Sequence, residues 1–257
     1  MIQIKNAAEL EKMRKACAIS AAALKAGGEA IEPGITTAEI DKIIYDFIVR
    51  HGARPNFLHL YGFPATACIS VNDTVIHGIP NKQQQIRPGD IVSIDTGCKI
   101  DGFNGDNACT YGCGKLDLEA QRLLDVTKES LHRGIEMARG GNRVGDISHA
   151  VQSYVEENGF SVVRTFVGHG VGKELHEDPE VPNYGNPGRG PRLVPGMTIA
   201  IEPMICQYDC KVKTLPDGWT VKTRDGGLAA HFEHSVAILK DRTEIMTIGW
   251  EDPDFTL

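Results

Sequence analysis

The sequence lacks several features that define whole classes of protein. No apolar run approaches the roughly 18 to 20 residues of a membrane-spanning helix, and charged residues interrupt the first 15 positions, where a signal peptide would be apolar. The seven cysteines are odd in number and form no Cys-x-x-Cys pair, which argues against a disulfide framework or a structural zinc module. We therefore expect a cytoplasmic protein without membrane contact.

Positive charge is also scarce. Lysine and arginine total 27 against 34 aspartates and glutamates, and a net charge of -7 does not favour nucleic-acid binding, so no nucleic-acid specificity is expected. The glycine-rich run 168–172 lacks the Lys-Ser/Thr ending of a phosphate loop, and no Gly-x-Ser-x-Gly nucleophile elbow is present. Metal-activated water is then the stronger hydrolytic hypothesis.

The two halves of the chain share features at one constant offset in the numbering. This offset carries Gly34 onto Gly141, and it carries the Pro-Gly turn at 88–89 onto the one at 195–196. Matches in a helix, a turn and a strand indicate an internal duplication. We predict a single catalytic domain over 1–257, with halves of roughly 1–115 and 116–257 that form two pseudo-symmetric lobes.

Each half is predicted to hold two helices followed by strands, which gives a mixed α and β class. The second helix should begin at Thr36 or Thr37 and stop at Gly52. Strands are expected at 91–94 and 198–201, and duplicated lobes should set equivalent central strands side by side along a cleft. The apolar stripes of the four helices are Leu10, Met13, Cys17 and Leu24; Ile40, Ile43, Ile44 and Phe47; Leu123, Val126, Leu131 and Ile135; and Ile147, Val151, Tyr154 and Val155.

Acidic residues occur at the ends of apolar strands in both halves. The offset maps Asp95 onto Glu202, while Asp106 and Glu233 lie in two further apolar runs and His169 lies in the glycine-rich run. Buried carboxylates that face one another repel unless a cation neutralises them. An oxygen-rich set with one imidazole suits Mn²⁺, Fe²⁺ or Co²⁺, and two ions could share bridging carboxylates.

Two of the nine histidines have the context of a binding site. His77 and His176 lie beside proline and glycine turn residues, where loops carry functional groups, so both are candidates for substrate contact. The remaining histidines other than His169 are interpreted as structural: His51, His59, His132, His149, His231 and His234.

Seven short motifs are spread along the chain: HGIP at 77–80, SIDTG at 93–97, GDNACT at 105–110, GHGVG at 168–172, HEDPEVPNYG at 176–185, IEPM at 201–204 and EHS at 233–235. Together they resemble the type I methionine aminopeptidases, and the likeness spans nearly the whole chain. This resemblance implies the pita-bread fold, an α+β class in which helices cover a central antiparallel sheet. It also implies a metal-dependent hydrolase that removes the initiator methionine from nascent proteins and peptides with a small second residue.

The resemblance implies a role for each metal ligand. Asp106 and Glu233 would bridge two divalent ions, Asp95 would chelate one, and His169 and Glu202 would complete the other. The expected ions are Co²⁺, Mn²⁺ or Fe²⁺, with Zn²⁺ and Ni²⁺ left open. Backbone carbonyls at 72, 74 and 229 match a monovalent-cation site of relatives.

The resemblance also implies catalytic and binding roles. Glu202 would accept a proton from the attacking water, His176 would stabilise the oxyanion, and His77 would contact the scissile amide. The expected partner is the N-terminal methionine of a nascent polypeptide, with transient ribosome contact and a monomeric state. The methionine pocket would be built from Phe57, Leu60, Phe63, Cys68, Leu175 and Trp219, and it is more aliphatic than usual because leucines stand at 60 and 175, where many relatives have aromatic residues.

Two other hypotheses remain open at this point. A proline-specific peptidase of the same fold, such as aminopeptidase P or prolidase, usually carries a large N-terminal domain, whereas the helical pattern here begins near residue 10. A non-catalytic binding protein of this fold would have lost metal ligands, whereas all five are present.

Overall fold

The computed structural model describes residues 1–251 and 257. Four α-helices and two short 3-10 helices are present among them: α1 (Ala7–Glu29), α2 (Thr37–Arg50), α3 (Leu118–Met137), α4 (Val144–Glu157), η1 (Leu60–Gly62) and η2 (Ile248–Trp250). The strands are β1 (Arg54–Pro55), β2 (Ala67–Val71), β3 (Thr74–Ile76), β4 (Ile91–Ile100), β5 (Phe103–Gly112), β6 (Ser161–Val162), β7 (Gly168–Gly170), β8 (Glu177–Val181), β9 (Thr198–Ile201), β10 (Met204–Cys206), β11 (Val212–Thr214), β12 (Val221–Thr223), β13 (Ala229–His231), β14 (Glu233–Ile238) and β15 (Thr243–Ile245).

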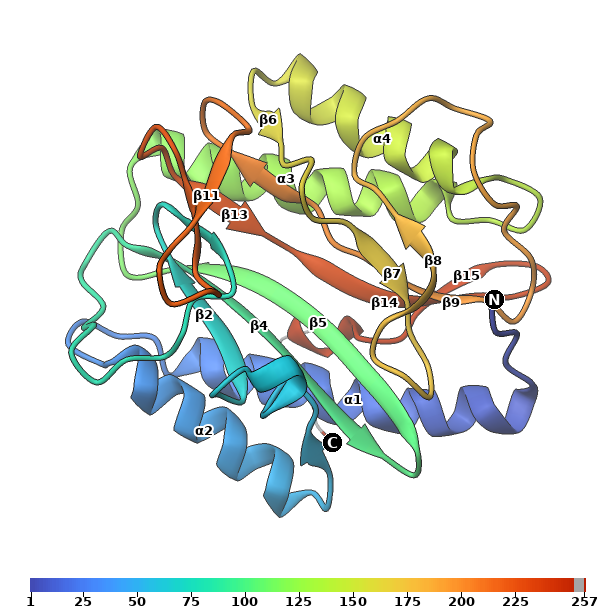
Figure 1. The fold of residues 1–257 in the computed structure, drawn as a ribbon, viewed down its shortest axis with the longest axis horizontal. Coiled ribbons are helices and arrows are strands. Elements are labelled where there is room, and N and C mark those ends of the chain that lie inside the picture. The colour runs from blue at the N-terminus through green and yellow to red at the C-terminus, as the bar shows by residue number, and fades with distance from the viewer. Residues whose placement is uncertain (252–256) are drawn as a thin grey trace.

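A nine-stranded sheet forms the centre of the molecule. Its order is β1-β4-β5-β14-β9-β7-β8, with β2 also paired to β4 and β15 also paired to β14. Two small sheets, β13-β10-β6 and β11-β12-β3, lie beside it. Figure 1 shows α1 and α2 along the part of the sheet built by the first half, and α3 and α4 along the other part. The pairings between the named strands of the central sheet are antiparallel, so the α+β prediction is confirmed.

Helix α2 begins where its capping residue predicts. The Thr36 side chain caps α2 and Glu39 reaches back to the Thr36 backbone, which forms a capping box. The helix ends at Arg50, and Gly52 follows with a φ of 73°. The stripes of α1 and α3 are buried as expected, whereas Ile43 and Phe47 of the α2 stripe are only partly buried.

The structure repeats its elements at the offset seen in the sequence. The shift that carries Gly34 onto Gly141 also carries both ends of α2 onto those of α4, and it carries β1 onto β6. Isolated bridges recur at the same offset, since Thr36 pairs with Gln85 and Arg143 pairs with Arg192. Two pseudo-symmetric halves are therefore confirmed. The division of the chain near 115 stays a prediction.

One expectation about the sheet is wrong. The strands related by the offset, β4 and β9, are not neighbours, because β5 and β14 lie between them. The contact between the halves is instead made by β5 and β14, where Glu233 pairs with Ala108 and His234 with Asn107. The reason is that β4 pairs with β5 and β9 pairs with β14, each within its own half, so that β5 and β14 are the strands that meet.

Further expectations concern cysteines and membranes. The seven cysteines are free thiols, and within residues 1–251 and 257 no group of potential metal ligands contains one. The same residues include no helix with the length and apolarity that crossing a bilayer requires.

Candidate metal centre and substrate pocket

A cavity of about 480 Å³ opens between the two halves, and both halves contribute to its walls. Every residue predicted for the site lines this one cavity, although the residues come from positions spread between 57 and 233 of the chain. They are Phe57, Leu60, Phe63, Cys68, His77, Asp95, Asp106, His169, Leu175, His176, Glu202, Trp219 and Glu233.

The carboxylates are held by the rigid centre of the sheet. Asp95 lies within β4 and Asp106 within β5, the two strands of one hairpin whose turn is formed by Asp101 and Gly102, both with positive φ. Glu233 begins β14, which pairs with β5. Glu202 directly follows β9, and its backbone carbonyl accepts a hydrogen bond of 2.9 Å from Asn183 Nδ2.

His169 reaches the centre from β7, a strand squeezed between its neighbours. A Cβ atom at Gly168 would overlap the carbonyl oxygen of Ala200, and one at Gly170 would overlap that of Asp178. Glycine on both sides of the histidine is therefore a packing requirement. The His169 Nδ1 lies 2.8 Å from the Gly170 carbonyl oxygen, so Nδ1 carries the proton and the lone pair of Nε2 faces the carboxylates.

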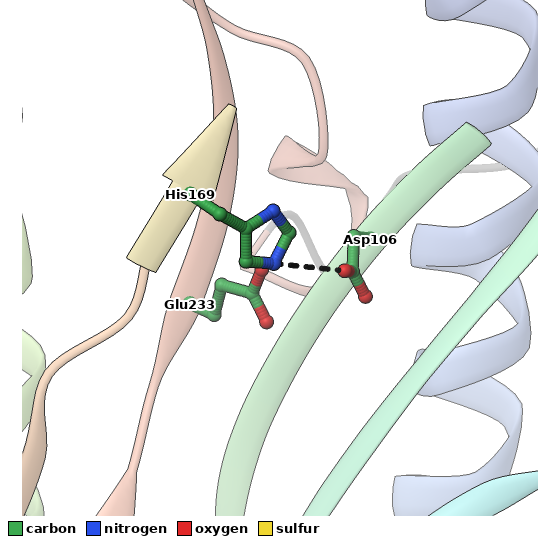
Figure 2. A group of neighbouring side chains, drawn as sticks. All are labelled: Asp106, His169 and Glu233. Carbon is green, nitrogen blue, oxygen red and sulfur yellow. Dashed lines mark ion pairs between the residues drawn. The ribbon is translucent and has the colours of Figure 1, made fainter. Parts of the chain in front are cut away.

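Three side chains converge closely, as Figure 2 shows for Asp106, His169 and Glu233. One ligand atom from each lies within 4.8 Å of the others. The His169 Nε2 is 3.6 Å from Asp106 Oδ2 and 3.6 Å from Glu202 Oε1. These separations are too long for good hydrogen bonds, and they leave room between the donor atoms for a cation.

Burial governs the charge of every group in this centre. It raises the pKa of Asp95, Asp106, Glu202 and Glu233, and the negative charge of neighbouring carboxylates raises the last three further. Burial, together with the nearby His176, lowers the pKa of His169 to about 3. The imidazole is thus neutral and can act as a ligand, while the carboxylates need a positive charge to ionise.

The donor set fits divalent cations. Asp95 Oδ1, Asp106 Oδ1 and Glu233 Oε1 are buried without a hydrogen-bond partner, which is costly for an ordinary structural carboxylate. Oxygen donors with one imidazole are the ligands that Mn²⁺, Fe²⁺ and Co²⁺ accept. A cation bound in the cavity would give these buried oxygens the partner that they lack.

The raised carboxyl pKa values predict how stability depends on pH when metal is removed. Below pH 7 the buried histidines with lowered pKa values act in the opposite direction, because an unfolded histidine binds a proton there. Between pH 7 and the Asp95 pKa of about 8, the folded state binds more protons than the unfolded state through its carboxyl groups, so stability should fall as pH rises. We expect the melting temperature of chelator-treated protein to drop on the order of 3 °C from pH 7 to pH 8. Calorimetry would measure it; a flat or rising melting temperature would contradict this account.

His77 and His176 lie on two walls of the cavity. His77 follows β3 with a φ of 56° and contacts the rings of Phe166 and Trp219 edge-on, at centroid distances of 5.5 and 6.2 Å. Burial and the neighbouring His176 lower the pKa of His77 to about 4, so its ring is neutral at pH 7. The His176 ring packs edge-on against His169 at 4.4 Å, and burial lowers its pKa as well.

An apolar cluster forms the part of the cavity beside these histidines. Leu60 and Leu175 give the cluster its aliphatic part. The rings of Phe63 and Trp219 meet edge-on, with their centroids 5.2 Å apart. The cluster comprises Phe57, Leu60, Phe63, Ala65, Cys68, Leu175, Ile79 and Trp219, which includes the six residues predicted for a methionine pocket.

The sequence prediction missed residues in the cavity and one directly behind it. Tyr61 and Phe166 line the cavity, and nothing in their sequence context marked them. His231 was expected to be structural, but its buried Nε2 has no hydrogen-bond partner and lies 3.7 Å from Glu202 Oε2, and burial lowers its pKa to about 3. A signal existed for His231, because it precedes Glu233 by two residues in an extended run and thus shares its side.

The three backbone carbonyls expected to bind a monovalent cation, at 72, 74 and 229, belong to neighbouring segments. The backbone amide of Ala229 donates a hydrogen bond of 2.9 Å to the Asn72 carbonyl, and Thr74 begins the adjacent β3. These segments lie together, and the cation itself stays a prediction.

Comparison with known proteins agrees with this geometry. The model of metallopeptidase family M24 matches residues 11–240. A methionine aminopeptidase of Clostridium perfringens is 54% identical over 248 residues, which cover 96% of this chain and 99% of that protein. A crystal structure of methionine aminopeptidase from Thermotoga maritima superposes with a TM-score of 0.95 at 44% identity and covers 96% and 99% of the two chains.

More distant structures share the fold alone. A prolidase from Pyrococcus horikoshii has a TM-score of 0.75 at 24% identity, and the match covers 95% of this chain but 63% of that one. The expected pita-bread fold is confirmed by these likenesses. The chain therefore belongs to metallopeptidase family M24 and, within that family, to the methionine aminopeptidases.

Proposed function

We propose that this chain is a metal-dependent aminopeptidase that removes the N-terminal methionine from polypeptides with a small second residue. The observation that carries the proposal is one cavity with two parts. One part holds four carboxylates and one neutral imidazole, and an apolar cluster that would receive a methionine side chain lies beside them. Family membership and the names of the relatives agree with this chemistry.

Two divalent ions would be held by Asp95, Asp106, His169, Glu202 and Glu233. Bound there, such ions would lower the pKa of water, polarise a carbonyl group and attract a free α-amino group. Glu202 is the proposed proton acceptor, because its carboxylate lies at the edge of this set and only 13% of its side chain is exposed. Its ionised form requires the cations, since burial alone raises its pKa.

The two wall histidines act on opposite sides of the scissile bond in this proposal. His176 donates a hydrogen bond to the oxygen of the attacked carbonyl, where negative charge develops. His77 contacts the scissile amide and assists departure of its nitrogen. Both rings have lowered pKa values and are neutral at pH 7, so each carries a single N–H to donate.

The apolar cluster selects the side chain of the first residue. Replacing Leu175, which is 7% exposed, by alanine should raise KM for a methionine peptide about tenfold with little change in kcat, because contacts with the bound side chain are lost. Steady-state kinetics would measure this. Leu118→Ala is the matched control, since Leu118 is 91% exposed; an equal effect of both substitutions would contradict the pocket assignment.

Further parts of the proposal concern the ions and the setting. We expect Co²⁺, Mn²⁺ or Fe²⁺ to support activity, with Zn²⁺ and Ni²⁺ as alternatives, because these ions share ligand preferences. We also expect a monomer in the cytoplasm that contacts the ribosome transiently, where nascent N-termini emerge.

Peptide hydrolysis tests the proposal directly. Protein stripped of metal with a chelator should be inactive, and reconstitution with each ion in turn should restore cleavage of Met-Ala-Ser. An Xaa-Pro peptide whose first residue is not methionine should remain intact, which separates this activity from that of the proline-specific peptidases. Cleavage of the proline peptide alone, or no dependence on metal, would refute the assignment.

A further inference from the structure

The N-terminal segment carries a buried cation for which the proposed chemistry has no use. Among the lysines, arginines, aspartates and glutamates that the structure describes, three fall in the buried class: Asp106, Glu233 and Lys5. The two acids belong to the candidate metal centre. Lys5 instead pairs with Glu177, and its Nζ lies 2.5 Å from Glu177 Oε2. The two side chains are only 4% and 6% exposed, so this is a desolvated ion pair rather than a surface one.

Glu177 uses both of its carboxylate oxygens. While Oε2 accepts from Lys5, Oε1 accepts a hydrogen bond of 3.2 Å from the backbone amide of Glu174. This second bond closes a turn over residues 174–177. His176 lies within that turn, directly before Glu177. Lys5, from the far N-terminal end of the chain, therefore holds the carboxylate that closes the turn carrying a proposed catalytic side chain.

The orientation of His176 depends on this turn. Its imidazole makes two ring contacts, edge-on with His169 at 4.4 Å and stacked with Tyr61 at 6.4 Å. Tyr61 is 79% exposed and gives little support. Because ring contacts fix direction less strictly than hydrogen bonds do, the backbone of the turn sets where the ring points.

The ion pair also packs against the segment that carries His169. A Cβ atom at Gly172 would lie 2.5 Å from Lys5 Cε and 2.5 Å from Glu177 Oε1, so the pair occupies the space directly over this glycine. The backbone amide of Lys5 donates a hydrogen bond of 2.8 Å to Gly196, in the turn that leads into β9 and Glu202. Lys5 thus contacts the segments that carry His169, His176 and Glu202, although it does not line the cavity itself.

We propose that Lys5 is a positioning residue that acts through Glu177 to hold His176 in its working orientation. The inference rests on the proposed function, because it concerns the reaction in which His176 takes part. The pair is more than a stabilising contact in this view, since its removal should misplace His176 while the metal ligands Asp95, Asp106 and Glu233, which lie in β4, β5 and β14, keep their positions.

Lys5→Met tests the idea, since methionine keeps most of the unbranched length of the side chain and removes its charge. We expect kcat for Met-Ala-Ser to fall between about ten- and a hundredfold, with KM within about twofold and metal content unchanged. Lys42→Met is the matched control, because Lys42 forms an exposed helical ion pair with Asp46 and should retain wild-type kinetics. A loss of metal or a change in KM alone would overturn the proposal.

A double variant separates positioning from stability. Lys5→Met leaves the Glu177 carboxylate buried without a cation and should lower the melting temperature; adding Glu177→Gln removes that charge and should restore much of it. We expect kcat of the double variant to stay low, since the amide is no longer tied to residue 5. Recovery of kcat together with melting temperature would show a merely stabilising role and overturn the proposal.

Hydrogen exchange gives a readout that needs no activity. In Lys5→Met the backbone amide of Glu174 should exchange at least about tenfold faster, while amides of β5 and β14 keep their protection. Unchanged exchange at 174 would overturn the inference. If the wild-type chain failed to hydrolyse methionine peptides but exchange still accelerated, the proposed function would fail while the hold of Lys5 on the turn would stand.

Discussion

Replacing Asp106 by asparagine should abolish metal binding and activity together. Asp106 is a proposed bridging ligand, and a neutral amide in its place removes a negative charge that both cations would share. We expect metal affinity to fall at least about a hundredfold, and kcat for Met-Ala-Ser to fall at least about a thousandfold. Metal analysis of purified protein and peptide hydrolysis would measure the two effects.

The same substitution should stabilise the metal-free protein. Asp106 is 3% exposed, and the charge of Asp95 raises its pKa. The charge of Asp106 in turn raises the pKa values of Glu202 and Glu233. Removing this carboxylate relieves part of the repulsion, so chelator-treated Asp106→Asn should melt above chelator-treated wild type. Asp101→Asn in the turn of the same hairpin is the control, because Asp101 is exposed and pairs with Lys15. Retention of metal by Asp106→Asn would refute the ligand assignment.

Replacing His77 by alanine should lower turnover and leave the metal in place. The His77 ring lines the cavity and lies outside the candidate metal centre. Its lowered pKa keeps the ring neutral at pH 7. Loss of a donor to the reacting amide should reduce kcat at least about a hundredfold, with metal content and KM little changed. Kinetics on Met-Ala-Ser with parallel metal analysis would decide it.

His59 offers a control matched in backbone strain. Both histidines have a positive φ, 68° at His59 and 56° at His77, so alanine is equally unfavourable at either position. His59 is exposed, and we expect His59→Ala to retain kcat. Equal loss in both variants would trace the effect of His77→Ala to loop strain rather than to a lost hydrogen bond. Unchanged activity of His77→Ala would contradict its role.

Local sequence signals specified the secondary structure well. The capping residues at 36 and 39 are close in the chain, and so are the turn at 101–102 and the apolar strands that flank it. Such signals act through neighbouring residues, and no distant contact is needed to interpret them. The strand predicted at 91–94 extends to Ile100, however, because pairing with β5 continues beyond its apolar part.

The repeat predicted the symmetry of the fold but not the order of its strands. The offset relates Asp95 to Glu202, yet it does not relate Asp106 to Glu233, which lie farther apart in the chain than the first pair does. Loops and the strands β11 and β12 lie before β14 in the second half and shift its numbering. Packing therefore decided which strands meet between the halves. The repeat suggested the strands that begin at 91 and 198, but β5 and β14 are the ones that pair.

The sequence by itself determined the kinds of residue that this site uses, the helices and strands that carry them, and the family to which the chain belongs. Only the tertiary structure decided which groups share one cavity, which of them lose their charge through burial, and which distant partners hold them. His231 beside Glu202 and Lys5 beside Glu177 are examples of the latter. The physical reason is that capping and periodicity are local, whereas desolvation and ion pairing depend on which segments the complete fold brings together.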